Sequence, residues 1–127
     1  MSAVCSPFKT IRGYSRADFD ALTRISKAAH ARLHDPQLNV AALADTLAMS
    51  PRSLHRSLVR LTGAAPVAWL RNLRIARARE HLLAGTSVAE AAHAVGMAPA
   101  YLARVYRTEH GISPSQEKAE VLMWVIG

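Results

Sequence analysis

The chain has 127 residues, 50% hydrophobic and 20% charged, so it can bury a packed core and is not a disordered tail. Its single cysteine excludes an internal disulfide and a zinc site built from several cysteines. The formal net charge is +7, and 13 of the 16 basic residues are arginines, whose planar guanidinium matches phosphate and the guanine edge. This composition fits a nucleic-acid partner as well as an ordinary solvated surface.

Helix caps and stops divide the chain into seven expected helices, and no stretch has the alternating β-branched pattern of a strand. Residues 1–14 show no helical periodicity and are expected to be flexible. The expected helices cover about 16–34, 40–47, 51–62, 66–84, 88–95, 99–110 and 114 onward. The apolar face of the first helix comprises Phe19, Leu22, Ile25, Ser26, Ala29 and Leu33. The sequence therefore predicts an all-α fold.

Residues 39–66 and 87–114 form an internal repeat with an offset of 48 residues and no gap. Nine of the 28 aligned positions are identical, and they fall at caps, stops and core positions. Each copy predicts a short helix, a tight turn and a second helix, which is the helix-turn-helix plan. Within a domain expected over 15–127, the first unit covers about 39–63, a long connecting helix about 66–84, and the second unit about 87–111.

The second helix of the first unit has one apolar and one polar face. Its core positions are Leu54, Leu58 and Leu61. Arg52, His55 and Arg56 share the opposite face near the helix start, where base-reading side chains lie in helix-turn-helix proteins. Ser53 is grouped with these DNA-binding candidates, and Arg60, at the flank, suits a phosphate.

The second unit carries fewer polar side chains at the matching positions. Ala100 and Ala103 replace Arg52 and His55, and Leu102 and Tyr106 are expected in the core. The remaining candidates for DNA contact are Ala100, Tyr101, Arg104, Arg107 and Thr108. Alanine cannot hydrogen-bond a base edge, so the first unit is predicted to dominate sequence recognition.

The connecting helix is predicted to be apolar on two sides. One apolar stripe comprises Trp69, Leu73, Ala76 and Leu83, and the other comprises Ile75, Ala78 and Leu82. A third stripe contains Arg74, Arg77 and His81. Contact with phosphate, plain solvation and pairing within the chain are open alternatives for this third stripe.

These motifs resemble the DNA-binding domain of the AraC/XylS family of bacterial transcription regulators. The resemblance lies in DPQLNVAALADTLAMSPRSLHRSLVRLTGAAPVAWLRNLRIARAREHLLAGTSVAEAAHAVG and HGISPSQ, and runs from about Phe19 to Gln116. It implies seven helices, two helix-turn-helix units that read adjacent major-groove segments, double-stranded DNA and RNA polymerase as partners, and no cofactor. It also points to Arg52, His55, Arg56, Ala100, Tyr101 and Arg104 as base-facing positions.

Three features depart from the family pattern. The second turn has Met97 in place of Phe and one residue fewer, and Glu117-Lys118 replaces the usual Tyr-Arg. The 127 residues leave no room for the sensing domain of most members, so the chain is expected to be a stand-alone regulator or the DNA-binding module of a longer one.

Other readings of the chain are an enzyme, a metal protein and a helical protein-interaction module. His30 and His34 have metal-ligand spacing on a helix but lack a third ligand, so no metal and no enzymatic activity are expected. Cys5 is expected to be a passive thiol. No apolar run is long enough to span a bilayer and the start lacks a signal peptide, so a cytoplasmic location is expected. With two DNA readers in one chain, a monomer is expected on DNA, and the apolar end VLMWVIG is a candidate partner surface.

Overall fold

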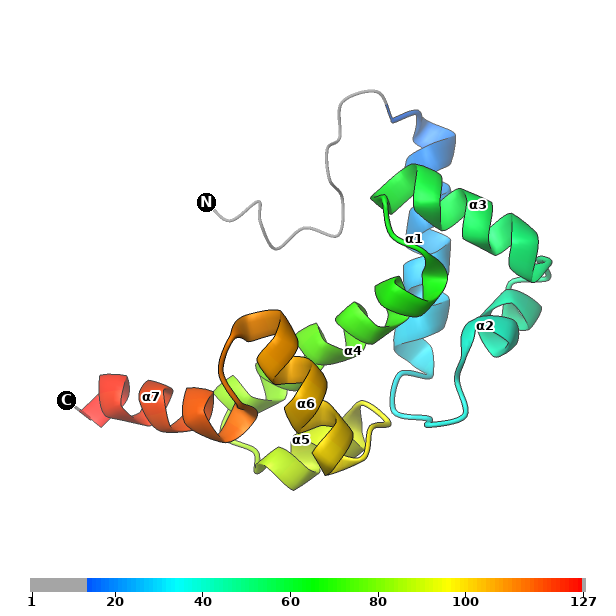
Figure 1. Cartoon of the computed structure of the whole chain (residues 1–127). Coiled ribbons are helices and arrows are strands. Elements are labelled where there is room, and N and C mark those ends of the chain that lie inside the picture. The colour runs from blue at the N-terminus through cyan, green and yellow to red at the C-terminus, as the bar shows by residue number, and fades with distance from the viewer. Residues whose placement is uncertain (1–13, 127) are drawn as a thin grey trace. The chain divides into compact units, whose positions relative to one another are not determined.

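The computed structural model describes residues 14–126, and over this range the chain forms seven helices and no strand (Figure 1). The helices are α1 (Arg16–Ala31), α2 (Val40–Thr46), α3 (Pro51–Thr62), α4 (Pro66–Leu83), α5 (Val88–Ala94), α6 (Pro99–His110) and α7 (Pro114–Ile126). The predicted all-α, seven-helix fold is therefore confirmed. The expected flexible segment lies outside the described residues, except for residue 14. None of the described helices is long and apolar enough to cross a membrane.

The internal repeat is reproduced helix by helix. The bounds of α5 are those of α2 shifted by 48 residues, and the same shift relates α6 to α3. Ser50 caps α3 by accepting a hydrogen bond from the Ser53 amide, whereas Ala98 provides no side-chain cap for α6. Both α3 and α6 end at a left-handed glycine, Gly63 or Gly111, with φ of 81°.

Over the described residues the first unit comprises 14–32 together with Leu38–Leu70, and its core lies between α1, α2 and α3. Fully buried side chains include Leu22 and Ile25 of α1 and Leu43 of α2. The first helix is shorter than predicted, since it ends at Ala31 with Arg32 as its C-cap. Phe19 was predicted on its buried face but is 43% exposed, because burial on α1 begins one turn later, at Leu22.

The second unit comprises Leu33–Gln37 and the chain from Arg71 on, so the boundary between the units falls within α4. Its core joins Ile75, Ala78 and Leu82 of α4 to residues of α5 and α6, as one predicted stripe of the connecting helix requires. For the other stripe, the prediction of burial is wrong for its last two residues. Trp69 is buried and Leu73 half-buried, but Ala76 and Leu83 are exposed, since Ile75, Ala78 and Leu82 supply the side of α4 that enters this core.

Polar contacts attach α7 to the second unit. The buried Glu117 carboxylate accepts a hydrogen bond from the Tyr106 hydroxyl and pairs with Arg79 at 2.8 Å. The Lys118 ammonium donates to the Thr86 carbonyl oxygen at 2.7 Å. Glu117 and Lys118, the two residues that depart from the family pattern, thus hold α7 against the rest of the second unit.

The turn of each helix pair requires one left-handed residue. It is Ala48, with φ of 56°, in the first unit and Gly96, with φ of 70°, in the second. A side chain on Gly96 would also meet the backbone, because its Cβ would lie 3.0 Å from the Leu33 carbonyl oxygen. The left-handed conformation costs an L-residue such as Ala48 roughly 1–2 kcal/mol, a cost that glycine avoids.

We expect opposite effects from exchanging alanine and glycine at these two equivalent positions. Ala48→Gly should raise the free energy of unfolding by about 0.5–1 kcal/mol, since relief of the left-handed strain exceeds the added entropy of the unfolded chain. Gly96→Ala should lower it by about 2 kcal/mol or more, because backbone strain and a backbone clash act together. Urea denaturation of the three proteins would measure both changes. Equal and opposite changes would show that the contact at Gly96 contributes nothing.

Candidate nucleic-acid interface

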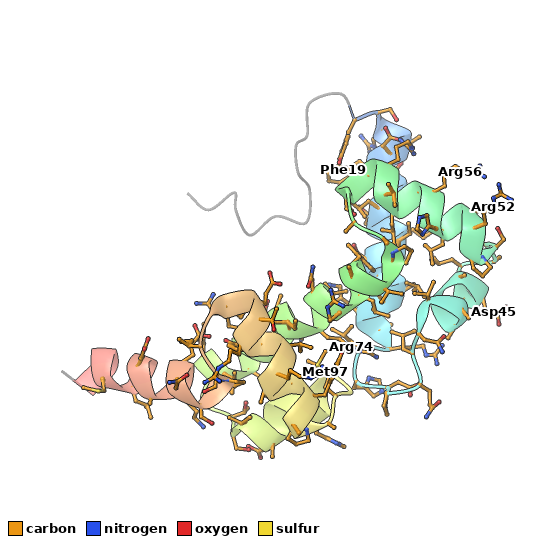
Figure 2. The ribbon with its side chains drawn as sticks, in the orientation of Figure 1. Phe19, Asp45, Arg52, Arg56, Arg74 and Met97 are labelled. Atoms are coloured by element: carbon orange, nitrogen blue, oxygen red, sulfur yellow. The ribbon has the colours of Figure 1, made fainter. Side chains whose placement is uncertain are left out.

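Helix α3 presents a cationic face opposite a fully buried apolar one. Leu54, Leu58 and Leu61 are buried, as predicted. Arg52, His55 and Arg56 lie together on the exposed face, and Figure 2 shows both arginines projecting from α3. Among residues 14–126 neither arginine is paired with a carboxylate, so both guanidinium groups are open to a ligand.

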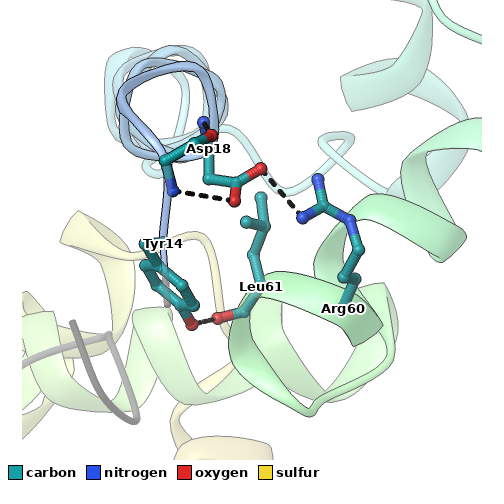
Figure 3. Close-up of polar contacts among 5 residues, drawn as sticks. Tyr14, Asp18, Arg60 and Leu61 are labelled. Carbon is teal, nitrogen blue, oxygen red and sulfur yellow. Dashed lines mark hydrogen bonds and ion pairs between the residues drawn. The ribbon is translucent and has the colours of Figure 1, made fainter. Parts of the chain in front are cut away.

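The other two residues predicted on α3 take part in contacts within the chain. Ser53 is half-buried, and its amide and hydroxyl both contact the Ser50 hydroxyl at the N-cap. Arg60 donates to Asp18 of α1 at 2.8 Å, yet 57% of its side chain remains exposed (Figure 3). Its guanidinium has five N–H donors, so a second acceptor can still bind it.

Asp18 is anchored at the start of α1 as well as to Arg60. Its carboxylate accepts a hydrogen bond from the Ser15 amide, and the Ser15 hydroxyl accepts one from the Asp18 amide. The hydrogen bond from the Ser15 backbone, followed by that from Arg60, holds the pKa of the Asp18 carboxyl below its ordinary value of 3.8. The sequence signalled this capping box but not the partner 42 residues away.

Helix α6 brings together the residues predicted in the second unit, but with less charge. The exposed residues are Ala100, Tyr101, Arg104, Arg107 and Thr108. The Arg104 guanidinium carbon lies 5.2 Å from the centre of the Tyr101 ring, which is within the range of a cation–π contact. The Thr108 hydroxyl donates to the Arg104 carbonyl within the same helix. Leu102 and Tyr106 are buried as predicted.

A groove between α4 and α6 adds a cation that the sequence-based prediction of the site did not include. Arg71 of α4 lines this groove of about 330 Å³ with Tyr101, Arg104, Thr108 and Glu109. Arg71 is half-buried and has no carboxylate partner among the described residues. Helical periodicity gave no reason to expect a DNA-contacting residue at Arg71 of α4. Arg71 lies beside Arg104 only because α4 packs against α6.

The other cations of α4 bind within the chain. Arg74 donates to the carbonyl oxygens of Leu33 and Asp35, and burial lowers the pKa of its guanidinium. Arg77 pairs with Glu80 at 2.8 Å. Of the alternatives for this stripe, pairing within the chain is therefore the one observed for both arginines.

The two histidines with metal-ligand spacing, His30 and His34, are both exposed. Over residues 14–126, no three His, Cys, Asp or Glu side chains come together as a group that could hold a metal ion. Cys5 lies outside the described residues.

Known proteins similar to this chain are helix-turn-helix transcription regulators. A family model described as a helix-turn-helix domain matches residues 43–120. The transcriptional activator NphR from a Rhodococcus species is 31% identical over 101 residues, which cover 78% of this chain and 30% of NphR. The DNA-binding domain of AdpA, a global transcriptional factor solved in complex with a target DNA, has 34% identity and a TM-score of 0.71, with 78% of this chain and 90% of that chain covered.

A fold match extends to a transcriptional regulator from Chromobacterium violaceum with an AraC-type DNA-binding domain. Its TM-score is 0.73 at 24% identity, and the match covers 84% of this chain and 96% of that one. Fold and family model together define the class as helix-turn-helix DNA-binding domains. The chain belongs to the AraC/XylS type within that class. It spans 30% or less of the length of the curated relatives that it matches.

The capping boxes predict how stability depends on pH. Hydrogen bonds from Ser87 lower the pKa of Glu90 below 4.5, as those of Ser15 and Arg60 do for Asp18. A carboxyl whose pKa falls on folding stabilises the fold above its unfolded-state pKa, and this contribution is lost as the pH drops through the folded value. Asp18→Asn and Glu90→Gln should therefore destabilise the chain more at about pH 6 than at about pH 3. Urea denaturation at both pH values measures this, and an equal loss at both would contradict it.

Proposed function

We propose that the chain binds a specific double-stranded DNA site through α3 and α6, with α3 as the dominant reader. One observation carries this proposal. The exposed face of α3 bears Arg52, His55 and Arg56 with no acidic residue on the helix, whereas α6 has alanines at the positions that match Arg52 and His55. A guanidinium can bond guanine O6 and N7 together, while alanine offers at most a methyl contact to thymine.

In this proposal the second unit positions the DNA more than it reads it. Arg104, Arg107 and Thr108 are exposed on α6, and Arg71 lies beside Arg104 in the groove. Three cations without carboxylate partners and one hydroxyl suit phosphate oxygens, which fix the register of a protein on DNA without reporting its sequence. Arg60, still partly exposed beside Asp18, takes a phosphate next to the first segment.

Two reading helices in one chain supply what a simple helix-turn-helix protein obtains by dimerising. We therefore propose a monomer on an asymmetric site, working in the cytoplasm as a bacterial transcription regulator with RNA polymerase as a second partner. The relatives named as transcriptional activators support the regulatory role.

The direct test is selection of bound sequences from random duplex DNA, followed by gel shifts of the selected duplex at several salt concentrations. Enrichment of an asymmetric site with more sequence information in the segment bound by α3 supports the proposal. Binding that shows no sequence preference, or enrichment of inverted repeats alone, refutes it.

We expect Arg56→Ala to weaken binding to the selected duplex by about 1–3 kcal/mol and to relax the preference at one or two base pairs, because a bidentate base contact is lost. Titration against the selected duplex and its single-base variants measures both effects. Arg24→Ala is the matched control, since it removes another exposed arginine, from α1. Equal losses in the two variants would mean that Arg56 contributes only charge.

We expect Arg71→Gln to weaken binding to all duplexes alike and to reduce the slope of log K against log salt by about 0.9, the value for one phosphate contact. Arg77→Gln changes the net charge equally on the same helix, but Arg77 is paired with Glu80. It should leave the slope near that of the original protein. A slope unchanged by Arg71→Gln would remove the groove from the interface.

A further inference from the structure

Tyr14, just before α1, and Asp18, in its first turn, each contact the last turn of α3 (Figure 3). The Tyr14 hydroxyl donates to the Leu61 carbonyl oxygen, one of the last four carbonyls of α3, which have no partner within a helix. The Asp18 carboxylate accepts from the Arg60 guanidinium at 2.8 Å. Side chains from one end of α1 thus bind both the backbone and a side chain of the proposed reading helix.

The Asp18–Arg60 pair differs from an ordinary surface ion pair. Only 18% of the Asp18 side chain is exposed, and the capping box with Ser15 fixes its carboxylate before Arg60 is added. The pair between Arg16 and Asp20, on the same helix, has a distance of 3.6 Å and side chains 90% and 68% exposed. Pairing costs an exposed side chain conformational entropy, and a carboxylate that is already fixed loses little of it.

These contacts add a polar restraint to the apolar one. The buried leucines fix which side of α3 faces inward, and the hydrogen bonds to Leu61 and Arg60 restrict small rotations and shifts of its last turn. Arg56 lies one turn before Arg60, and Arg52 one turn before Arg56, so a small rotation at the end of α3 displaces both. Productive contacts need placement within about 0.5 Å and 10–20°.

We infer that Tyr14 and Asp18 are positioning residues for DNA recognition: they hold the C-terminal turn of α3 through Leu61 and Arg60, and so fix the orientation of the face that carries Arg52 and Arg56. Neither residue is required to touch DNA. This inference rests on the proposed function of α3.

The test compares four single variants of the full chain, and Asp18→Asn in an Arg60→Gln background, on the duplex selected with the original protein. Tyr14→Phe removes one contact to α3, and Asp18→Asn removes the negative charge from the other. Asp20→Asn makes the same change in charge on α1 without touching α3, and Glu90→Gln removes the equivalent capping-box carboxylate from α5 without touching a reading helix. Binding, base preference in the segment assigned to α3, and melting temperature are measured for each.

Asp18→Asn should bind the selected duplex roughly five- to tenfold more weakly than Asp20→Asn, the size of effect expected from one typical hydrogen bond. It should also discriminate less against single-base changes in the α3 segment, with a melting temperature no lower than that of Glu90→Gln. Tyr14→Phe should change binding in the same direction by a smaller factor. In an Arg60→Gln background, Asp18→Asn should produce little further loss.

Equal binding by Asp18→Asn and Asp20→Asn would overturn the inference. Tighter binding by Asp18→Asn with a steeper salt slope would also overturn it, because Asp18 would then compete with phosphate for Arg60. Failure of the original protein to select any sequence would refute the proposed function itself, and the two failures are therefore distinguishable.

Discussion

The burial of three leucines on one side of α3 is the constraint on which the candidate interface depends. Leu54, Leu58 and Leu61 have no exposed surface, so the helix cannot turn its other side inward. Arg52, His55 and Arg56 must then face outward, whatever they bind. The cap at Ser50 begins this helix at a fixed residue, and the left-handed turn at Ala48 sets the direction in which it leaves α2. The polar face is therefore a consequence of the apolar one.

The two repeats share this construction but use it differently. Their helix bounds match residue for residue, which shows that caps, turn and apolar positions carry the fold. The exposed positions can differ between the two repeats without changing the fold. Arginine and histidine on α3 correspond to alanines on α6. The second unit instead buries Tyr106 and Glu117, and the exposed Arg79 pairs with that carboxylate, so that the three residues hold α7. An internal hydrogen-bonded carboxylate of this kind contributes to a defined fold but offers nothing to a ligand.

Features set by local sequence could be predicted, and features set by packing between distant segments could not. Capping at Ser15, Asn39, Ser50 and Ser87 is a local interaction, so most helix starts follow from the sequence. The contact of Arg60 with Asp18 and the groove beside Arg71 join segments that are far apart in sequence. Periodicity also failed at the exposed Phe19 and Leu83, because it reports which side chains share a face but not how much of that face a neighbour covers.

The same distinction decides what the net charge of +7 means. Several arginines are already engaged within the chain: Arg16 and Arg60 by aspartates, Arg77 and Arg79 by glutamates, and Arg74 by two backbone carbonyls. Over the described residues, those without a carboxylate partner include Arg52 and Arg56 on α3, Arg104 and Arg107 on α6, and Arg71 in the groove. A uniform excess of charge would attract any polyanion. Cations left unpaired chiefly on the outward faces of two helix-turn-helix units favour a ligand with phosphates at regular spacing, and duplex DNA has that form.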